Sequence, residues 1–213
     1  FVLFDAVARN FAGLPEAVNA VWRAGQCRRQ EFDAQINQAR LNALKTDLKP
    51  EQLAAADKAY QDALAGLRQA IGLLYAAAQE FGRKDPGSSA HQQLLYETAW
   101  CCRSLAEDEI DAARRQIQEA AIQKLRQKLP QGAPAPAVPG VAISQLPVQP
   151  SETTARLLYE RLLAAAPNSE LAARARLELA DMLASRPDHA DDVASAAKCL
   201  AEAADILDGD VSL

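Results

Sequence analysis

Breaks that contain proline or glycine divide this chain into long segments with almost no helix-breaking residue. The breaks are Leu14-Pro15, Lys49-Pro50, Gly82 to Ser89, Pro130 to Pro150, Pro167-Asn168-Ser169 and Arg186-Pro187-Asp188. Between them apolar residues recur every three or four positions, which is the period of an α-helix. The pattern predicts an all-α fold with helices near residues 1–12, 16–48, 51–81, 89–129, 152–166, 169–185 and 190–207.

The composition argues against membrane spans and against nucleic-acid binding. Of the 213 residues, 49% are hydrophobic and 24% charged, so the chain can bury a core but is too polar for a membrane-spanning helix. The net charge of -5 comes from acidic and basic residues interleaved along the whole chain, without the basic patch that binds nucleic acid or a membrane surface. Neither nucleic acid nor a membrane surface is therefore expected as a partner.

No catalytic, metal or cofactor site is expected from the residue pattern. The two histidines, His91 and His189, lie far apart, and there is no glycine-rich phosphate loop or nucleophile elbow. The four cysteines fit neither a zinc spacing nor a compact disulfide framework, so we expect free, mostly buried thiols. They are Cys27, Cys101, Cys102 and Cys199. A disulfide between Cys27 or Cys199 and one member of the adjacent pair remains an alternative.

The segments 16–48 and 51–81 predict two helices of roughly 50 Å each, at 1.5 Å per residue. Helices of this length need a partner along most of their length. In the second segment apolar residues alternate at steps of three and four, the spacing of a coiled-coil seam. They are Leu53, Ala56, Tyr60, Ala63, Leu67, Ala70, Leu74, Ala77 and Phe81. With similar steps from Phe32 to Ala43, this predicts a coiled-coil-like helical hairpin that turns at Lys49-Pro50.

Two short patterns recur along the chain. In the first, a bulky apolar residue is followed by a small residue three positions later and another apolar residue two beyond. Its copies are residues 22–27, 96–101 and 177–182. In the second, an alanine is followed by apolar residues four and seven positions later. Its copies are Ala70-Leu74-Ala77, Ala155-Tyr159-Leu162 and Ala196-Leu200-Ala203. A small residue in the first pattern allows a neighbouring helix to approach closely.

These patterns resemble the two helices of a tetratricopeptide repeat, and Pro167 stands where the family has its closing proline. The resemblance covers most of the chain and implies a right-handed solenoid of helical hairpins with three repeats. Arg28 and Arg176 depart from the family, which has apolar residues there. The third repeat, with Tyr159, Pro167 and residues 177–183, resembles those of bacterial envelope proteins.

The resemblance implies three parts. Residues 1–129 hold the long hairpin inserted in the first repeat, residues 130–150 form a connector, and residues 151–213 complete the same solenoid. The connector contains six of the eleven prolines and should be extended, but it is apolar enough that we expect it to lie along the solenoid surface. Residues 1–12 are expected to close an earlier repeat of a longer protein. A signal peptide is not observable, so the location stays open between cytoplasm and periplasm or cell envelope.

In the tetratricopeptide family the first helices build a concave, peptide-binding face. The matching positions are Trp22, Gln26, Arg29, Tyr96, Trp100, Arg103, Leu177 and Asp181. Tryptophan, tyrosine and arginine contribute strongly to interfaces, so partner binding is expected there. Packing of the aromatic rings between repeats is the alternative. The lysines and asparagines that hold a chaperone's carboxylate tail in this family are absent from these positions.

The acidic run Glu107, Asp108, Glu109 and Asp111, followed by Arg114 and Arg115, predicts a solvated helix face without a binding role. The expected function is a non-catalytic protein-interaction scaffold, a segment of a larger protein with many such repeats, which contacts its partner through the groove or the long hairpin. Two alternatives remain: a peptide-sensing regulatory module, and a structural subunit of a cell-envelope complex that associates with itself.

Overall fold

The computed structural model describes residues 16–43, 49–128, 140–186 and 190–210, and the isolated positions 3, 6, 7, 10 and 137. Its elements are α2 (Glu16–Ala43), α3 (Pro50–Lys84), α4 (Ser89–Arg126), the 3₁₀ turn η1 (Ile143–Gln145), α5 (Pro150–Ala165), α6 (Glu170–Ala184) and α7 (Ala190–Asp210). These ranges contain no strand, which confirms the all-α prediction. The predicted helix over 1–12 and the connector residues 130–136 lie almost entirely outside the described residues.

The breaks in the sequence begin and end the helices by ordinary capping. Pro50 and Pro150 stand at the first positions of α3 and α5, where the missing backbone N–H has no helical partner to lose. The Ser88 hydroxyl accepts a hydrogen bond from the backbone N–H of His91, and Ser169 does the same for α6. Gly87, at φ +86°, makes the turn between α3 and α4.

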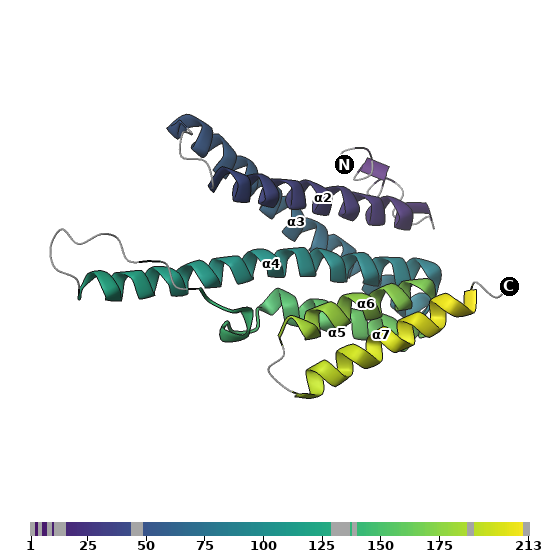
Figure 1. The fold of residues 1–213 in the computed structure, drawn as a ribbon. Helices are drawn as coiled ribbons and strands as arrows, with labels where there is room; N and C mark the ends of the chain where they lie inside the picture. The colour runs from purple at the N-terminus through teal and green to yellow at the C-terminus, as the bar shows by residue number, and fades with distance from the viewer. Residues whose placement is uncertain are drawn as a thin grey trace.

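α4 is the central helix of the molecule. It packs against α2 and α3 on one side and against α5 and α6 on the other, and α7 packs on α6. Figure 1 shows α4 running across the middle, with α2 and α3 above it and the three C-terminal helices below. One continuous hydrophobic core extends from Val18 in α2 through Leu74 and Leu94 to Met182 in α6.

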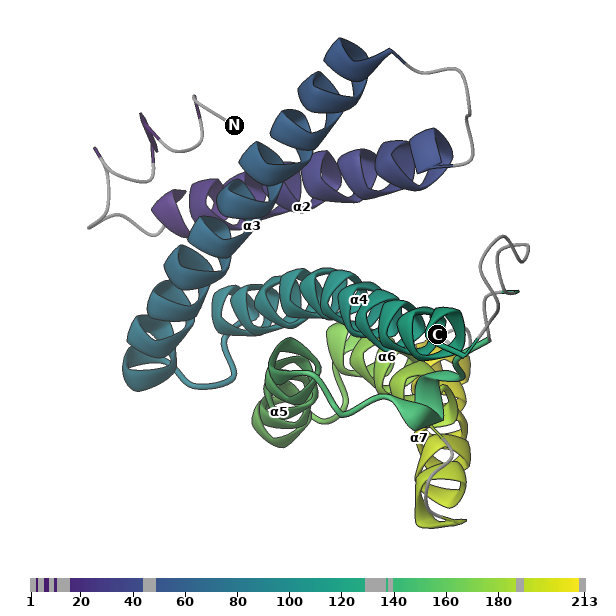
Figure 2. The same cartoon turned by 90° about the vertical axis from the view of Figure 1, so that its left-hand side faces the viewer.

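The helices α2 and α3 cross each other and do not pair along their whole length. Phe32 and Ile36 of α2 are buried, but the buried residues of α3 begin only at Ala63. Figure 2 shows the start of α3 extending away from α2. α3 packs on α4 as well as on α2, and its N-terminal turns diverge from α2. The apolar positions of the predicted seam are therefore buried or partly buried from Ala63 onward, and the prediction of pairing along the whole hairpin is wrong.

Small residues permit the closest helix contacts. A Cβ atom built on Gly25 would lie 2.5 Å from Cδ1 of Leu74, so α2 and α3 approach at this point more closely than alanine allows. The equivalent residues of the other two segments, Ala99 and Ala180, are buried in α4 and α6. The expected role of a small residue at a helix crossing is thus clearest at Gly25.

The described end of the connector lies against the helices, as predicted. Leu146 is buried, and the carbonyl oxygens of Ile143, Leu146 and Pro147 all accept hydrogen bonds from the guanidinium of Arg186 at the end of α6. Arg186 also forms an ion pair with Glu152 in the first turn of α5. This short stretch is therefore part of the folded surface.

Candidate functional site

Two of the predicted groove residues contact each other between α2 and α4. The Arg29 guanidinium lies 4.1 Å from the ring centroid of Trp100, and its Nε donates to Glu97 Oε1 at 2.8 Å. Glu97 and Arg29 are both buried. The Arg29 guanidinium is therefore already engaged by the Trp100 ring and the Glu97 carboxylate. It is not free to bind an external ligand.

Other predicted residues join α4 to α5 and α6. Arg103 forms ion pairs with Glu178 and Asp181 of α6. The buried ring of Tyr96 meets Trp100 edge-on at 5.4 Å and lies 6.0 Å from Tyr159 of α5. Tyr96 thus packs between α4 and α5, within one predicted repeat, rather than lining an open groove.

Of the remaining groove residues, Trp22 is partly buried against the core and Gln26 is partly buried. Arg23 stacks on the Trp22 ring at 4.3 Å and donates to Gln26 at 3.0 Å, and Leu177 is exposed on α6. The face across α2, α4 and α6 is thus largely filled by contacts within the chain. Partner binding by these eight residues stays a prediction.

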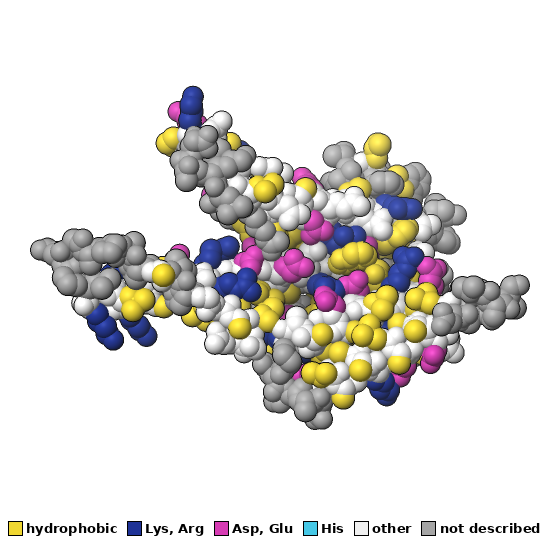
Figure 3. Space-filling view, viewed as in Figure 1, with side chains coloured by type: hydrophobic (Ala, Val, Ile, Leu, Met, Phe, Trp, Pro, Cys, Tyr) yellow, Lys and Arg dark blue, Asp and Glu magenta, His cyan; other side chains and the backbone are white. Residues whose placement is uncertain are grey.

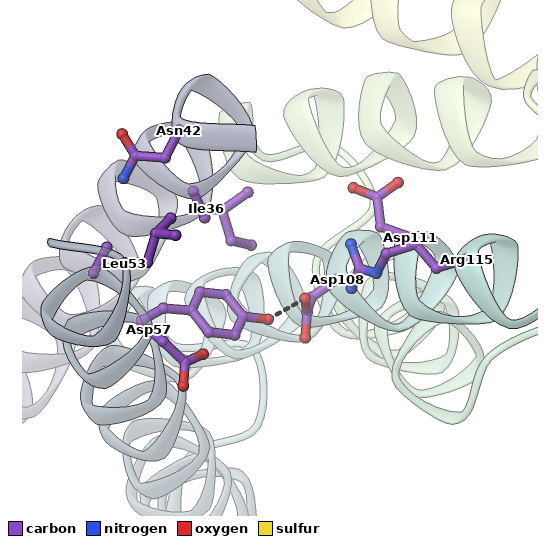
Figure 4. Close-up of a pocket in the computed structure, with 10 residues that line it drawn as sticks. Ile36, Asn42, Leu53, Asp57, Asp108, Asp111 and Arg115 are labelled. Atoms are coloured by element: carbon purple, nitrogen blue, oxygen red, sulfur yellow. Dashed lines mark hydrogen bonds between the residues drawn. The ribbon is translucent and has the colours of Figure 1, made fainter. Parts of the chain in front are cut away.

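A hollow lies elsewhere, where α2 and α3 diverge above α4. It has a volume of about 390 Å³. Its lining residues come from three helices and are Ile36, Ala39, Asn42, Leu53, Ala56, Asp57, Tyr60, Asp108, Asp111 and Arg115. We call this hollow the wedge cleft. Figure 4 shows Leu53 and Ile36 facing it from α3 and α2, opposite the charged residues of α4.

Tyr60 forms the polar base of the wedge cleft. Its ring lies 6.1 Å from Phe32, and its hydroxyl donates a short hydrogen bond to Asp108 of α4, drawn as the dashed line in Figure 4. Burial raises the pKa of Tyr60 well above its ordinary value, and the Asp108 carboxylate raises it further. The phenol therefore stays protonated and fixes the Asp108 side chain at the cleft.

Among the described residues that line the wedge cleft, Asp57, Asp108 and Asp111 are acidic and Arg115 is basic. The Arg115 side chain points toward Asp108 in Figure 4, and Asp111 pairs with Arg114 at 2.9 Å. An apolar wall beside an acidic edge suits a ligand that combines a hydrophobic side chain with a cationic one.

The prediction of a solvated face is therefore wrong for three members of the acidic run of α4. Asp108 and Asp111 line the wedge cleft, and Glu109 accepts hydrogen bonds from the backbone N–H and the hydroxyl of Ser151, at 3.1 and 2.8 Å, at the start of α5. The spacing of Asp108, Asp111 and Arg115 places all three on one face of α4, which is the signal that the sequence contained.

A second hollow, of about 430 Å³, lies where the end of α3 and the start of α4 meet α5. His91 and Leu95 line it from α4, and Arg161 from α5 donates to the Tyr75 hydroxyl at 3.4 Å. It brings together fewer charged groups than the wedge cleft does. For this reason we treat the wedge cleft as the stronger candidate.

The cysteines are free thiols in a structural setting. All four are unpaired by disulfides, and Cys101 and Cys102 are buried. Burial raises the pKa of Cys101 well above its ordinary value and raises that of Cys102 to about 12. Neither thiol of the pair is therefore activated as a nucleophile. Within the described part of the chain, no three histidine, cysteine, aspartate or glutamate side chains are grouped as a metal site requires.

None of the helices that the structure describes has a stretch long and apolar enough to cross a membrane. No family model matches the chain, and the searches of curated proteins and of solved structures also find no match.

Proposed function

We propose that this chain is a non-catalytic protein-interaction scaffold that holds a segment of its partner in the wedge cleft. The observation that carries the proposal is the cleft itself, in which Leu53 and Ile36 form an apolar wall opposite the carboxylates of α4. Three helices contribute to it, so its shape depends on how the N-terminal hairpin sits on α4.

We also propose that the helices form a solenoid of the tetratricopeptide kind. The packing order supports this: α2, α4 and α6 contact one another in sequence, and each also packs on the helix that follows it. The small residues Gly25, Ala99 and Ala180 occupy matching buried positions in these three helices. Ala70, Ala155 and Ala196 are likewise buried in α3, α5 and α7.

The volume of the wedge cleft indicates the kind of ligand. About 390 Å³ lies at the small end of the range of ligand pockets and accommodates one or two side chains rather than a whole helix. A partner would therefore insert one large apolar residue as an anchor, the arrangement that concentrates binding energy at an interface. A lysine or arginine next to the anchor would face Asp57, Asp108 and Asp111.

The test is a selection of displayed peptides against the immobilised chain, followed by binding measurements with the selected peptides. We expect them to share a large apolar residue beside a cation, and their binding to weaken at high salt. Leu53→Arg should abolish binding, because it removes part of the apolar wall and repels the cation.

Leu73→Arg is the matched control. Leu73 lies on the same helix and is 46% exposed, against 48% for Leu53, but it does not line the cleft. Equal binding by wild type and both variants would exclude the wedge cleft as the site. Peptides without the predicted pairing of residue types would exclude the proposed ligand chemistry.

A further inference from the structure

The second hollow, between α3, α4 and α5, differs from the wedge cleft in the sign of its charge. Its described lining residues include Arg161 of α5 and His91 of α4, and none of them is an aspartate or a glutamate. Over the middle of the face shown in Figure 3, by contrast, basic and acidic side chains lie next to each other. A hollow lined in this way favours an anionic ligand. It shares no lining residue with the wedge cleft, so it is independent of the proposed partner site.

His91 presents a hydrogen-bond donor of fixed position in this hollow. The backbone N–H of Gly87 donates to its Nδ1 at 3.2 Å, and a ring nitrogen that accepts a hydrogen bond carries no proton. The proton of the neutral imidazole is therefore on Nε2. A Cβ atom built on Gly82 would lie 2.8 Å from Nε2, so glycine there leaves open space beside this donor. Asp85 acts on the imidazole electrostatically but does not line the hollow.

Tyr75 and Arg161 add further donors. Nη1 of Arg161 donates to the Tyr75 hydroxyl oxygen at 3.4 Å, and the Gln79 side chain also forms a hydrogen bond with this hydroxyl. Both bonds lower the pKa of Tyr75, as donors to its oxygen do. A hydroxyl that accepts hydrogen bonds still has its own hydrogen to donate. Among the residues that the structure describes, the Arg161 guanidinium has no partner other than Tyr75, so its remaining N–H groups can reach a ligand.

The rest of the lining is apolar and small. It consists of Ala78, Leu95, Ala164 and Ala165, with Gly82 between the polar groups, and both Ala78 and Leu95 are buried. The volume of about 430 Å³ lies in the lower part of the range of ligand pockets. Apolar walls with a few convergent polar groups are the usual construction of a small-molecule site. The ligand should therefore have an apolar body and one anionic end.

We propose that the second hollow binds a small monocarboxylate with an aliphatic body. Its carboxylate accepts hydrogen bonds from Arg161, Tyr75 and His91, and its chain lies against the apolar residues of the lining. The planar guanidinium matches the two oxygens of a carboxylate. One guanidinium balances one negative charge, which favours a monocarboxylate over a phosphate dianion. The ligand would contact α3, α4 and α5 together, because each of these helices supplies one of the three donors.

The first test is calorimetric titration of the whole chain with four compounds that share an eight-carbon chain: octanoate, octanol, octylamine and octyl phosphate. We expect octanoate to bind at a single saturable site, and octanol and octylamine to bind at least about tenfold more weakly, because they lack the anionic end. Absence of octanoate binding, or equal binding of octanol, overturns the proposal. Tighter binding of octyl phosphate than of octanoate overturns the assignment to a carboxylate.

The second test places the ligand in the hollow. Arg161→Gln should raise the Kd of octanoate about tenfold to a hundredfold, and Tyr75→Phe should raise it about tenfold. Arg174→Gln is the matched control, because Arg174 is an exposed arginine on α6 that does not line the hollow. Circular dichroism verifies that each variant keeps its helices.

Nitrogen-15 NMR of the imidazole gives a readout that does not depend on the variants. Octanoate should shift the Nε2–H signal of His91 in the wild type, and His91→Asn serves to assign that signal. An Nε2–H signal that does not move at saturation overturns the contact with His91. Unchanged affinity in Arg161→Gln, or an equal loss in Arg174→Gln, would show that octanoate binds another apolar surface and overturns the proposal.

Discussion

Arg186 and Glu152 form an ion pair in which Nε and Oε1 are 2.8 Å apart and the side chains are only 3% and 5% exposed. The rest of the guanidinium donates to backbone carbonyls of the connector, at 2.7 Å to Leu146. A single residue at the end of α6 thereby joins the connector to the start of α5. The buried charges have no access to water as a substitute partner, which makes this contact hard to replace.

Replacing Arg186 by methionine should destabilise the chain by about 3 kcal/mol, because it leaves several carbonyls without their donor and leaves the buried Glu152 carboxylate with Arg156, at 3.1 Å, in place of two arginines. Urea unfolding measures the change, and hydrogen exchange at Leu146 should become faster. Arg174→Met is the control: Arg174 pairs with Glu170 at 2.6 Å on the surface, where such a pair contributes less than about 1 kcal/mol. Similar losses in both variants would contradict the buried role of Arg186.

Arg29 and Glu97 should be strongly coupled. Glu97→Leu alone leaves the buried Arg29 guanidinium beside Trp100 with only the more exposed Asp33 carboxylate, at 3.5 Å, and should cost about 3 kcal/mol. Arg29→Met alone leaves the Glu97 carboxylate buried without its guanidinium partner. The double variant should lose less than the sum of the two single losses, by about 1–3 kcal/mol. Denaturant unfolding of all four proteins gives this coupling directly, and additive losses would show that the pair does not act as a unit.

Two glycines within helices should respond to alanine in opposite directions. At Gly25 the new methyl group would collide with the buried Leu74, and the overpacking of about 1–3 kcal/mol should outweigh the gain in helix propensity. At Gly72 of α3 a Cβ atom meets nothing within 4 Å, so alanine should stabilise the chain by about 0.5–1 kcal/mol. Thermal unfolding of the two variants compares the signs, and stabilisation by Gly25→Ala would show that the crossing has room to spare.

His91 should contribute a pH-dependent part of the stability. Its Nδ1 accepts a hydrogen bond from the backbone N–H of Gly87, and burial lowers the pKa of the imidazole although Asp85 acts in the opposite direction. The neutral form is thus favoured in the folded chain. The contribution is present above the unfolded pKa of about 6.5 and is lost as the pH falls through the lowered folded value.

His91→Asn keeps an acceptor near the position of Nδ1 and removes the titration. The free energy of unfolding of the wild type should therefore fall more steeply than that of the variant as the pH is lowered from 7 toward 5. Carboxylates titrate in both proteins, so the difference between the two curves is the quantity to compare. Parallel curves would rule out a titrating role for His91.

The helix boundaries could be predicted because they depend on neighbours in the sequence. Proline at the first helical position, serine at an N-cap and glycine at a turn act through backbone groups a few residues away. The start of α4 at Ser89 and the ends of α5 and α6 lie within one residue of the predicted positions. Gly25 also predicted a close contact between helices, because the absence of a side chain lets α3 approach α2 there.

The candidate site was harder to predict because it depends on how helices cross. The heptad steps of α3 predict pairing along its whole length, yet Leu53 is left at the wedge cleft where α2 and α3 diverge. Arg186 appears in the sequence only as part of a turn. Its carbonyl partners and Glu152 lie between 34 and 43 residues away along the chain, beyond the reach of any local pattern.

Because α4 belongs to both groups of helices, neither group can melt without exposing apolar surface of the other. Loss of the N-terminal hairpin would expose the side of α4 that packs on α2 and α3, and loss of the C-terminal helices would expose the other side. In a helical array the stability of each unit depends on its contacts with the neighbouring units. Here a shared central helix couples the halves, so calorimetry should record one cooperative heat-absorption peak for the whole chain.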